Sequence, residues 1–191
     1  PRMFFPDQAR LRRVRGSELV DVAAQSLVSA LHPGMLLYHL AMLPKASGSA
    51  EAVALADEML ATTDDSEPDR RAWILGLKSY ALMDLKDYGG AILCLRDALT
   101  LDAQPETAAT NHASLGFALK SEEKWQEASE QYEHACELDP RYTHAYDSRG
   151  FVLEKLGLTE EALEMFHQAL AIDRTYAPAI ANHRRLCTLP D

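Results

Sequence analysis

The chain has 191 residues, of which 47% are hydrophobic and 25% charged, so its composition excludes disordered, collagen-like and disulfide-stapled classes. The formal net charge is −10, and residues 1–16 alone carry +4, which leaves −14 on the rest of the chain. Such an acidic body repels phosphate, so we expect no nucleic-acid partner. No apolar run approaches the ~18 residues of a membrane span. Three cysteines without a CxxC pair predict reduced thiols and a cytoplasmic protein.

The N-terminal part is the least regular. Residues 1–16 form a basic arm, which either touches an acidic partner, a membrane surface or nucleic acid, or is a frayed end or strap on its own acidic body; the second interpretation is favoured. Residues 17–71 form a divergent helical region. It contains a helix over 17–31, which is either part of a repeat or a lid, and a helix pair over 35–42 and 50–63.

From residue 72 onward the chain repeats itself. A shift of 34 residues aligns small and large apolar positions in pairs: Gly116 with Gly150, Ala128 with Ala162, Tyr132 with Phe166, and Ala135 with Ala169. A third copy lies upstream at an offset of 37 residues. There, Ser79 occupies the position of Gly116. Each copy shows two helical patterns separated by a short break. The units are 72–108, 109–142 and 143–176, and a capping helix and tail occupy 177–191.

This spacing of Leu-Gly, Ala, a large aromatic residue, Ala and Asp-Pro, with a period of about 34 residues, resembles the tetratricopeptide repeat (TPR) family. The resemblance implies an all-α fold, an α-solenoid of stacked antiparallel helix pairs that winds as a right-handed superhelix. With the divergent region included, we expect about ten helices.

Motifs of catalysis are missing from the sequence, which lacks GxGxxG, GxxxxGK[ST], HExxH and GxSxG. His112, His144 and His183 recur near the starts of successive first helices, but no Cys/His pair has the spacing of metal ligands. Cys94, Cys136 and Cys187 lie among apolar helix positions, as buried structural thiols do. We therefore expect no enzyme activity, no cofactor and no metal.

The resemblance implies a binding groove lined by the first helix of each pair. The groove positions that carry over are Trp73, Gly76, Tyr80, Met83 and Asp84; Thr110, Ala113, Phe117, Lys120 and Ser121; and His144, Asp147, Phe151, Glu154 and Lys155. The equivalent residues Tyr80, Phe117 and Phe151 either form an aromatic ladder along the groove or pack against neighbouring helices. An exposed ladder suits an extended peptide or a partner helix.

Some family members grip the C-terminal carboxylate of chaperones with a clamp of Lys, Asn and Arg. The matching positions here are Gly76, Tyr80, Ser114, His144 and Ser148, and moving the frame one unit on gives Ala113, Phe117, Ser148, Pro178 and Asn182. Neither set supplies the cations that a carboxylate needs. The sequence therefore argues against a clamp-type co-chaperone.

The function expected from these features is a non-enzymatic scaffold or adaptor that binds a protein or peptide. Two alternatives stay open. Because the chain begins with Pro1, it is also readable as the interaction domain of a larger enzyme or regulator, and its architecture is similar to small type III secretion chaperones. The polar residues His183, Arg184 and Arg185 resemble a cap on the end of the array, so we expect a monomer, with a dimer as the alternative.

Overall fold

The computed structural model describes residues 48–101 and 104–188, and within them every regular element is a helix. The eight helices are α3 (Ser49–Thr62), α4 (Pro68–Asp84), α5 (Tyr88–Leu101), α6 (Pro105–Ser121), α7 (Trp125–Leu138), α8 (Thr143–Lys155), α9 (Thr159–Ile172) and α10 (Ala177–Cys187). The described ranges therefore contain eight helices, whereas we expected about ten for the chain. The arm over 1–16 and the helices predicted over 17–31 and 35–42 lie outside the described residues. No helix in the described ranges is long and apolar enough to cross a bilayer.

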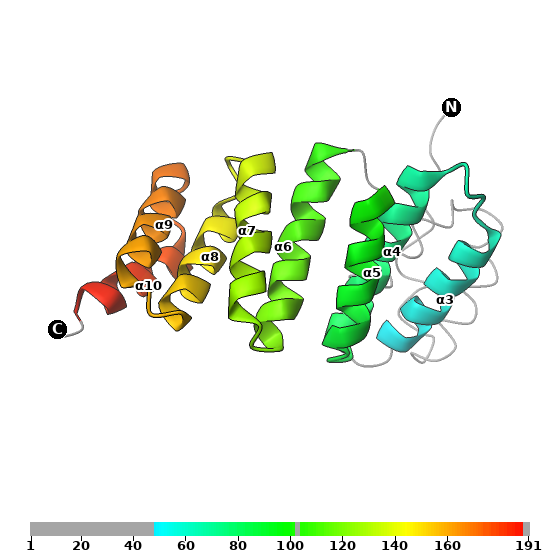
Figure 1. The fold of residues 1–191 in the computed structure, drawn as a ribbon, viewed down its shortest axis with the longest axis horizontal. Coiled ribbons are helices and arrows are strands. Elements are labelled where there is room, and N and C mark those ends of the chain that lie inside the picture. The colour runs from blue at the N-terminus through cyan, green and yellow to red at the C-terminus, as the bar shows by residue number, and fades with distance from the viewer. Residues whose placement is uncertain (1–47, 102–103, 189–191) are drawn as a thin grey trace, which may run out of the picture.

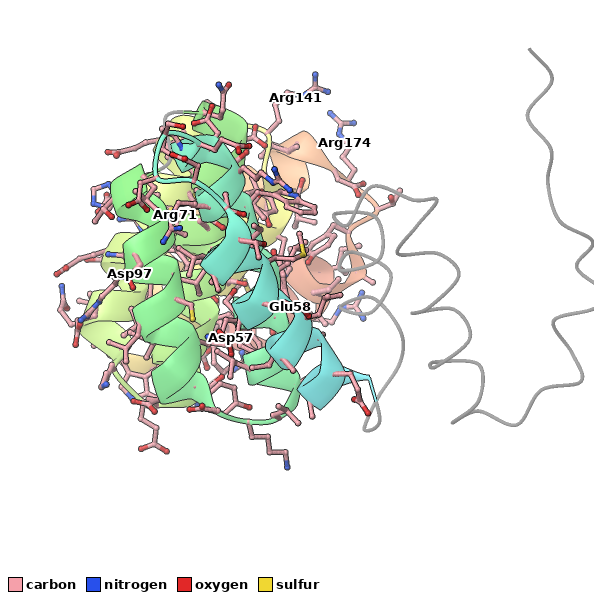
Figure 2. The ribbon with its side chains drawn as sticks, turned by 90° about the vertical axis from the view of Figure 1, so that its right-hand side faces the viewer. Asp57, Glu58, Arg71, Asp97, Arg141 and Arg174 are labelled. Carbon is pink, nitrogen blue, oxygen red and sulfur yellow. The ribbon has the colours of Figure 1, made fainter. Side chains whose placement is uncertain are left out.

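The helices stack side by side in one row from α3 to α10 (Figure 1). Each first helix packs on its second helix, as α4 does on α5, α6 on α7, and α8 on α9. The first helices also contact one another, α4 with α6, α6 with α8, and α8 with α10. They therefore share one side of the stack. Seen from the α3 end, Arg141 and Arg174 extend from one edge, where the connections between successive pairs lie (Figure 2).

The turn inside each pair has the same hydrogen-bonded form. One residue per turn has a left-handed backbone: Lys86 at φ 62°, Glu123 at φ 58° and Gly157 at φ 80°. The next residue donates its N–H to a carbonyl of the helix just ended, as in Asp87 to Leu82 at 2.9 Å, Lys124 to Leu119 at 3.0 Å and Leu158 to Leu153 at 3.0 Å. This pattern is the Schellman motif, which satisfies the last carbonyls of a helix. It reverses the chain in the same way three times.

Two aromatic side chains fill the centre of the stack where the repeat predicts close helix contact. Tyr132 and Phe166 are completely buried. A Cβ atom added to Gly116 would lie 3.0 Å from the Tyr132 ring, and one added to Gly150 would lie 2.6 Å from the Phe166 ring. Glycine therefore allows the closest approach of the first helix to the ring, and a larger residue would force the ring to shift, most of all at Gly150.

In the pair formed by α4 and α5, Ser79 replaces the glycine of the first helix, and the buried side chain of the second helix is smaller than an aromatic ring. Leu95 stands at the place of the aromatic residue, and both side chains are completely buried. The Ser79 hydroxyl donates a 2.6 Å hydrogen bond to the Gly76 carbonyl of its own helix, so its polar atom is satisfied inside the core. The larger first-helix residue and the smaller second-helix residue compensate in volume.

Helix α10 is tied to α8 by polar contacts. Asn182 Nδ2 donates to Asp147 Oδ1 at 2.9 Å. Arg185 pairs with both carboxylate oxygens of Glu154, with 2.6 Å between Nη2 and Oε2. Leu186 completes a buried cluster with Phe166. Helix α10 thereby covers the last pair, and its exposed residues include both polar and apolar types: Arg184, Arg185, Ala177, Pro178, Ala181 and Cys187.

Replacing Gly150 with alanine tests the close contact with Phe166. Overpacking costs about 1–3 kcal/mol, while alanine gains about 0.5–1 kcal/mol of helix propensity over glycine. Because Phe166 is completely buried and the added Cβ would lie 2.6 Å from its ring, we expect a net loss of about 1–2 kcal/mol in the free energy of unfolding, measured by urea denaturation.

The control is Gly89→Ala, where the added Cβ would meet nothing closer than 3.9 Å. That variant should be neutral or slightly stabilising. Phe166→Leu should lower the free energy of unfolding less in the Gly150→Ala variant than in wild type, because leucine relieves the contact between the added Cβ and the Phe166 ring. Equal costs in the two backgrounds would show that the ring and Gly150 are not coupled.

A pH series tests the contacts to α10. Burial raises the pKa of Asp147, so ionising this carboxylate disfavours the folded state above that pKa. Asp147→Asn should keep the acceptor for Asn182 and be more stable than wild type at pH 7. As pH falls through the raised pKa towards the ordinary value near 3.8, the wild-type carboxyl is protonated and the difference should shrink.

Glu154→Gln should behave in the opposite way. The hydrogen bond from Arg185 holds the pKa of Glu154 below its usual value, so the ionised form stabilises the folded state. This variant should lose stability at pH 7, and the loss should vanish as pH falls below that lowered pKa. The measurement is the urea midpoint at each pH. If the urea midpoints of both variants and of wild type changed with pH in the same way, the raised pKa of Asp147 and the lowered pKa of Glu154 would be contradicted.

Candidate functional site

A hollow of about 470 Å³ opens on the side of the stack that the first helices share. Its walls are mainly apolar, and they come from α4, α6 and the start of α8, with one residue from α5. The lining residues are Tyr80, Met83, Asp84, Tyr88, Ala113, Ser114, Phe117, Tyr142 and His144. A concave site with apolar walls and few polar groups is the usual form of a binding pocket.

Several side chains that line the hollow are buried or hydrogen-bonded to one another. Ala113 and Ser114 are buried, and Met83 is half-buried against the core. Ser114 Oγ donates a 3.0 Å hydrogen bond to the Tyr80 hydroxyl, which fixes the Tyr80 ring of α4 against α6. Phe117 differs from these residues because 38% of its surface is exposed. The hollow therefore presents the accessible ring of Phe117 beside buried side chains, and His144 on its wall is exposed as well.

Beside the hollow, ammonium groups and aromatic rings alternate along α6 and α8. Lys120 Nζ lies 4.9 Å from the centre of the Phe117 ring and 5.5 Å from that of Phe151. Lys155 Nζ lies 5.4 Å from the Phe151 ring. These are cation–π distances. We call Lys120 with the Phe117 and Phe151 rings the lysine slot. Burial lowers the pKa of Lys120, and the charge of Asp147 partly opposes this effect.

The carboxylates of the predicted groove have partners within the chain. Asp84 accepts a 3.1 Å hydrogen bond from Ser49. Asp147 accepts from Asn182, and Glu154 pairs with Arg185. The contacts of Asp147 and Glu154 turn these two side chains towards α10. Sequence spacing alone assigns them to the groove, whereas the structure uses them to hold the last helix.

The structure brings nine of the predicted groove residues together at the hollow and the slot: Tyr80, Met83, Asp84, Ala113, Phe117, His144, Lys120, Phe151 and Lys155. The others lie apart from them. Trp73 is half-buried against the cluster that α3 forms with α4, and Thr110 is half-buried on α6. Gly76 is buried, and a Cβ atom added there would lie 3.0 Å from Asn111 Oδ1.

Of the three equivalent aromatic residues, Phe117 alone is exposed. Tyr80 and Phe151 are half-buried and pack against core clusters while their remaining surface faces the hollow or the slot. The two interpretations of the aromatic ladder therefore both describe part of the geometry. Whether the three rings bind a ligand stays a prediction.

Sequence reasoning missed three lining residues, Tyr88, Ser114 and Tyr142. The signal for Tyr142 is present in the repeat, since Tyr176 stands at the equivalent place of the next unit. Ser114 enters the sequence argument only as a position that lacks the charge of a clamp. Tyr88 begins α5 directly after a turn, a place that helix periodicity does not mark.

Four histidines of the described ranges lie in two pairs. His112 lies against His134, with ring centres 5.2 Å apart, and His183 against His167, with ring centres 4.4 Å apart. No group of three His, Cys, Asp or Glu side chains among the described residues could hold a metal ion. Burial raises the pKa of Cys94, and it raises that of Cys136 to about 12, so both thiols are protonated and poor nucleophiles at neutral pH. The expectation of a buried thiol is wrong for Cys187, which is exposed at the end of α10.

Family comparisons agree with the repeat. Residues 116–157 match the sequence model of the TPR repeat, and residues 74–105 and 143–176 match that of the tetratricopeptide repeat. A curated relative, the probable UDP-N-acetylglucosamine–peptide N-acetylglucosaminyltransferase SPINDLY of Hordeum vulgare, is 32% identical over 99 residues. The match covers 48% of this chain and 10% of the relative, so the chain spans about a tenth of that protein's length.

Solved structures show the same fold. MamA superimposes with a TM-score of 0.66 at 19% identity, covering 81% of this chain and 80% of that chain. The TPR domain of Arabidopsis OM64 gives 0.59 at 23% identity, with coverage of 62% and 96%. The first TPR of Spaghetti (RPAP3), bound to the HSP90 peptide SRMEEVD, gives 0.58 at 22% identity, with coverage of 62% and 92%. With its regular sequence repeat, its stacked helix pairs and these matches, the chain belongs to the tetratricopeptide repeat family.

Proposed function

We propose that this chain is a non-enzymatic interaction module that binds an extended peptide or a partner helix on the side formed by α4, α6 and α8. The observation that carries the proposal is the exposed Phe117 ring at the edge of a preformed apolar hollow. An exposed aromatic side chain beside a rigid concave surface is a typical anchor for a protein ligand.

The structural neighbours support the same role. The first TPR of RPAP3 is bound to an HSP90 peptide, and the second TPR domain of human RPAP3 is in complex with the HSP70 peptide SGPTIEEVD. Their identity to this chain, at 22%, carries the fold and not the ligand. Peptide binding on the side shared by the first helices is therefore a proposal for this chain, and the side chains of that surface determine which peptide it would bind.

The remaining expectations stay proposals alongside this function. The acidic body argues against nucleic acid, and the exposed charges of Arg184 and Arg185 on α10 argue for a monomer. The unpaired cysteines fit a reducing compartment such as the cytoplasm. The right-handed course of the superhelix and the unit boundaries 72–108, 109–142 and 143–176 are also predictions.

A second candidate is that these residues form the interaction part of a larger enzyme or regulator. The observation that favours it is the match to a tenth of a glycosyltransferase-named relative. The full open reading frame in the source genome tests this candidate. Coding sequence for a further folded domain would support it, and a frame that starts and stops within a few residues of this chain would remove it.

Phe117→Ala tests the binding surface. A random-peptide library is selected on the full chain, and the affinities of the recovered peptides are then measured by fluorescence anisotropy. We expect Phe117→Ala to weaken these peptides by about tenfold or more, because it removes the accessible ring of the hollow. Circular dichroism confirms that the variant is folded.

The matched control is Leu93→Ala. Leu93 is 64% exposed on α5, a second helix, and is absent from the hollow. Its truncation should leave peptide affinity unchanged. Peptides that bind both variants as well as wild type would move binding away from the hollow, and a library that yields no binder would contradict the proposed function.

A further inference from the structure

We propose that the lysine slot recognises an acidic side chain of the bound peptide, so that the ligand carries an Asp or Glu next to an apolar residue seated in the hollow. This inference rests on the proposed function, because it names the chemistry of the segment that binds there. It uses Lys120, which lies outside both clamp frames considered from the sequence.

The geometry holds the Lys120 ammonium in place without neutralising it. The Phe117 and Phe151 rings lie 4.9 and 5.5 Å away and attract the cation with the negative faces of their π systems. Among the described residues, no carboxylate lies within ion-pair distance of Lys120 or of Lys155. Asp147 acts on Lys120 through its charge at longer range, while its own Oδ1 accepts the hydrogen bond from Asn182.

The charged groups on this side of the stack differ in whether an opposite charge or a hydrogen-bond donor contacts them. Glu154 is neutralised by Arg185, and the Asp84 carboxylate accepts from Ser49. Loss of surrounding water, together with Lys120 nearby, lowers the pKa of His144 below its ordinary value, so the imidazole is neutral at pH 7. Around the slot, the ammonium groups of Lys120 and Lys155 are left without an opposite charge in contact from any residue that the structure describes.

Partial burial makes Lys120 the stronger of the two lysines as a binding group. Lys155 is exposed and keeps its water, whereas Lys120 is half-buried on α6. A cation that has already lost part of its hydration shell has less water to give up when a carboxylate arrives. A carboxylate in this setting also forms a charge-assisted hydrogen bond, which is stronger than a neutral one.

Phe117 links the slot to the hollow, because its ring belongs to both. A peptide that places an apolar side chain in the hollow would have its neighbouring residues at the slot. Charge complementarity there is local, since the chain as a whole carries −10. Long-range attraction alone would favour a basic peptide, and an experiment can separate these two preferences.

The test uses the same random-peptide selection on the full chain, performed with wild type and with Lys120→Met. Methionine keeps an apolar stem of similar length and removes the charge. We expect peptides selected on wild type to be enriched in Asp or Glu beside an apolar position. The acidic enrichment should disappear on Lys120→Met, and the apolar position should remain.

A double-mutant cycle measures the contact directly. For one selected peptide, Glu→Gln in the peptide and Lys120→Met in the protein should each weaken binding by about tenfold. The two changes together should cost little more than either alone. Lys124→Met is the matched control, since Lys124 pairs with Glu122 at 2.7 Å and its loss changes the net charge equally. It should leave the acidic preference unchanged.

Three results would overturn the inference, and they separate it from the proposed function. Peptides that depend on Phe117 but show no acidic preference, or a basic one, would leave groove binding intact and refute the lysine slot. An acidic preference that survives Lys120→Met would do the same. Recovery of no peptide that depends on Phe117 would refute both.

Discussion

A large, completely buried side chain of the second helix, Leu95, Tyr132 or Phe166, lies at the same place in each pair, and the rest of this structure depends on it. Where Gly150 meets Phe166 and Gly116 meets Tyr132, a single Cβ atom would force the neighbouring ring to move. Because this contact recurs at the same place in successive units, their first helices occupy equivalent positions and come into contact with one another. The shared side on which the hollow opens is a consequence of that repetition.

Sequence reasoning predicted the features that a repeat enforces. Small residues at one spacing and large residues at another predict helix pairs, and the family matches confirm the assignment. The helix predicted over 50–63 corresponds to α3 at Ser49–Thr62. The turns were only partly visible, since Gly157 marks one of them, whereas Lys86 and Glu123 adopt a left-handed backbone that their residue types do not announce.

The site was less predictable because its properties depend on contacts between units. Repeat position places Asp147 and Glu154 beside Lys120 and Phe151 as groove candidates, yet Asn182 and Arg185 of α10 hold the two carboxylates. Spacing gives the face of a helix on which a residue lies. It does not give the partner that a side chain finds 31 or 35 residues later in the chain.

The same contacts explain how an acidic repeat protein can offer a cationic binding point. Helix α10 binds two carboxylates: Arg185 neutralises Glu154, while Asn182 donates to Asp147, whose charge still acts on Lys120 at longer range. Lys120 stays over aromatic rings, which attract a cation but cannot neutralise its charge. The capping helix thus contributes to the electrostatics of the groove without lining the hollow, and changes at Asn182 or Arg185 would alter the charge presented to a ligand as well as the stability of the last pair.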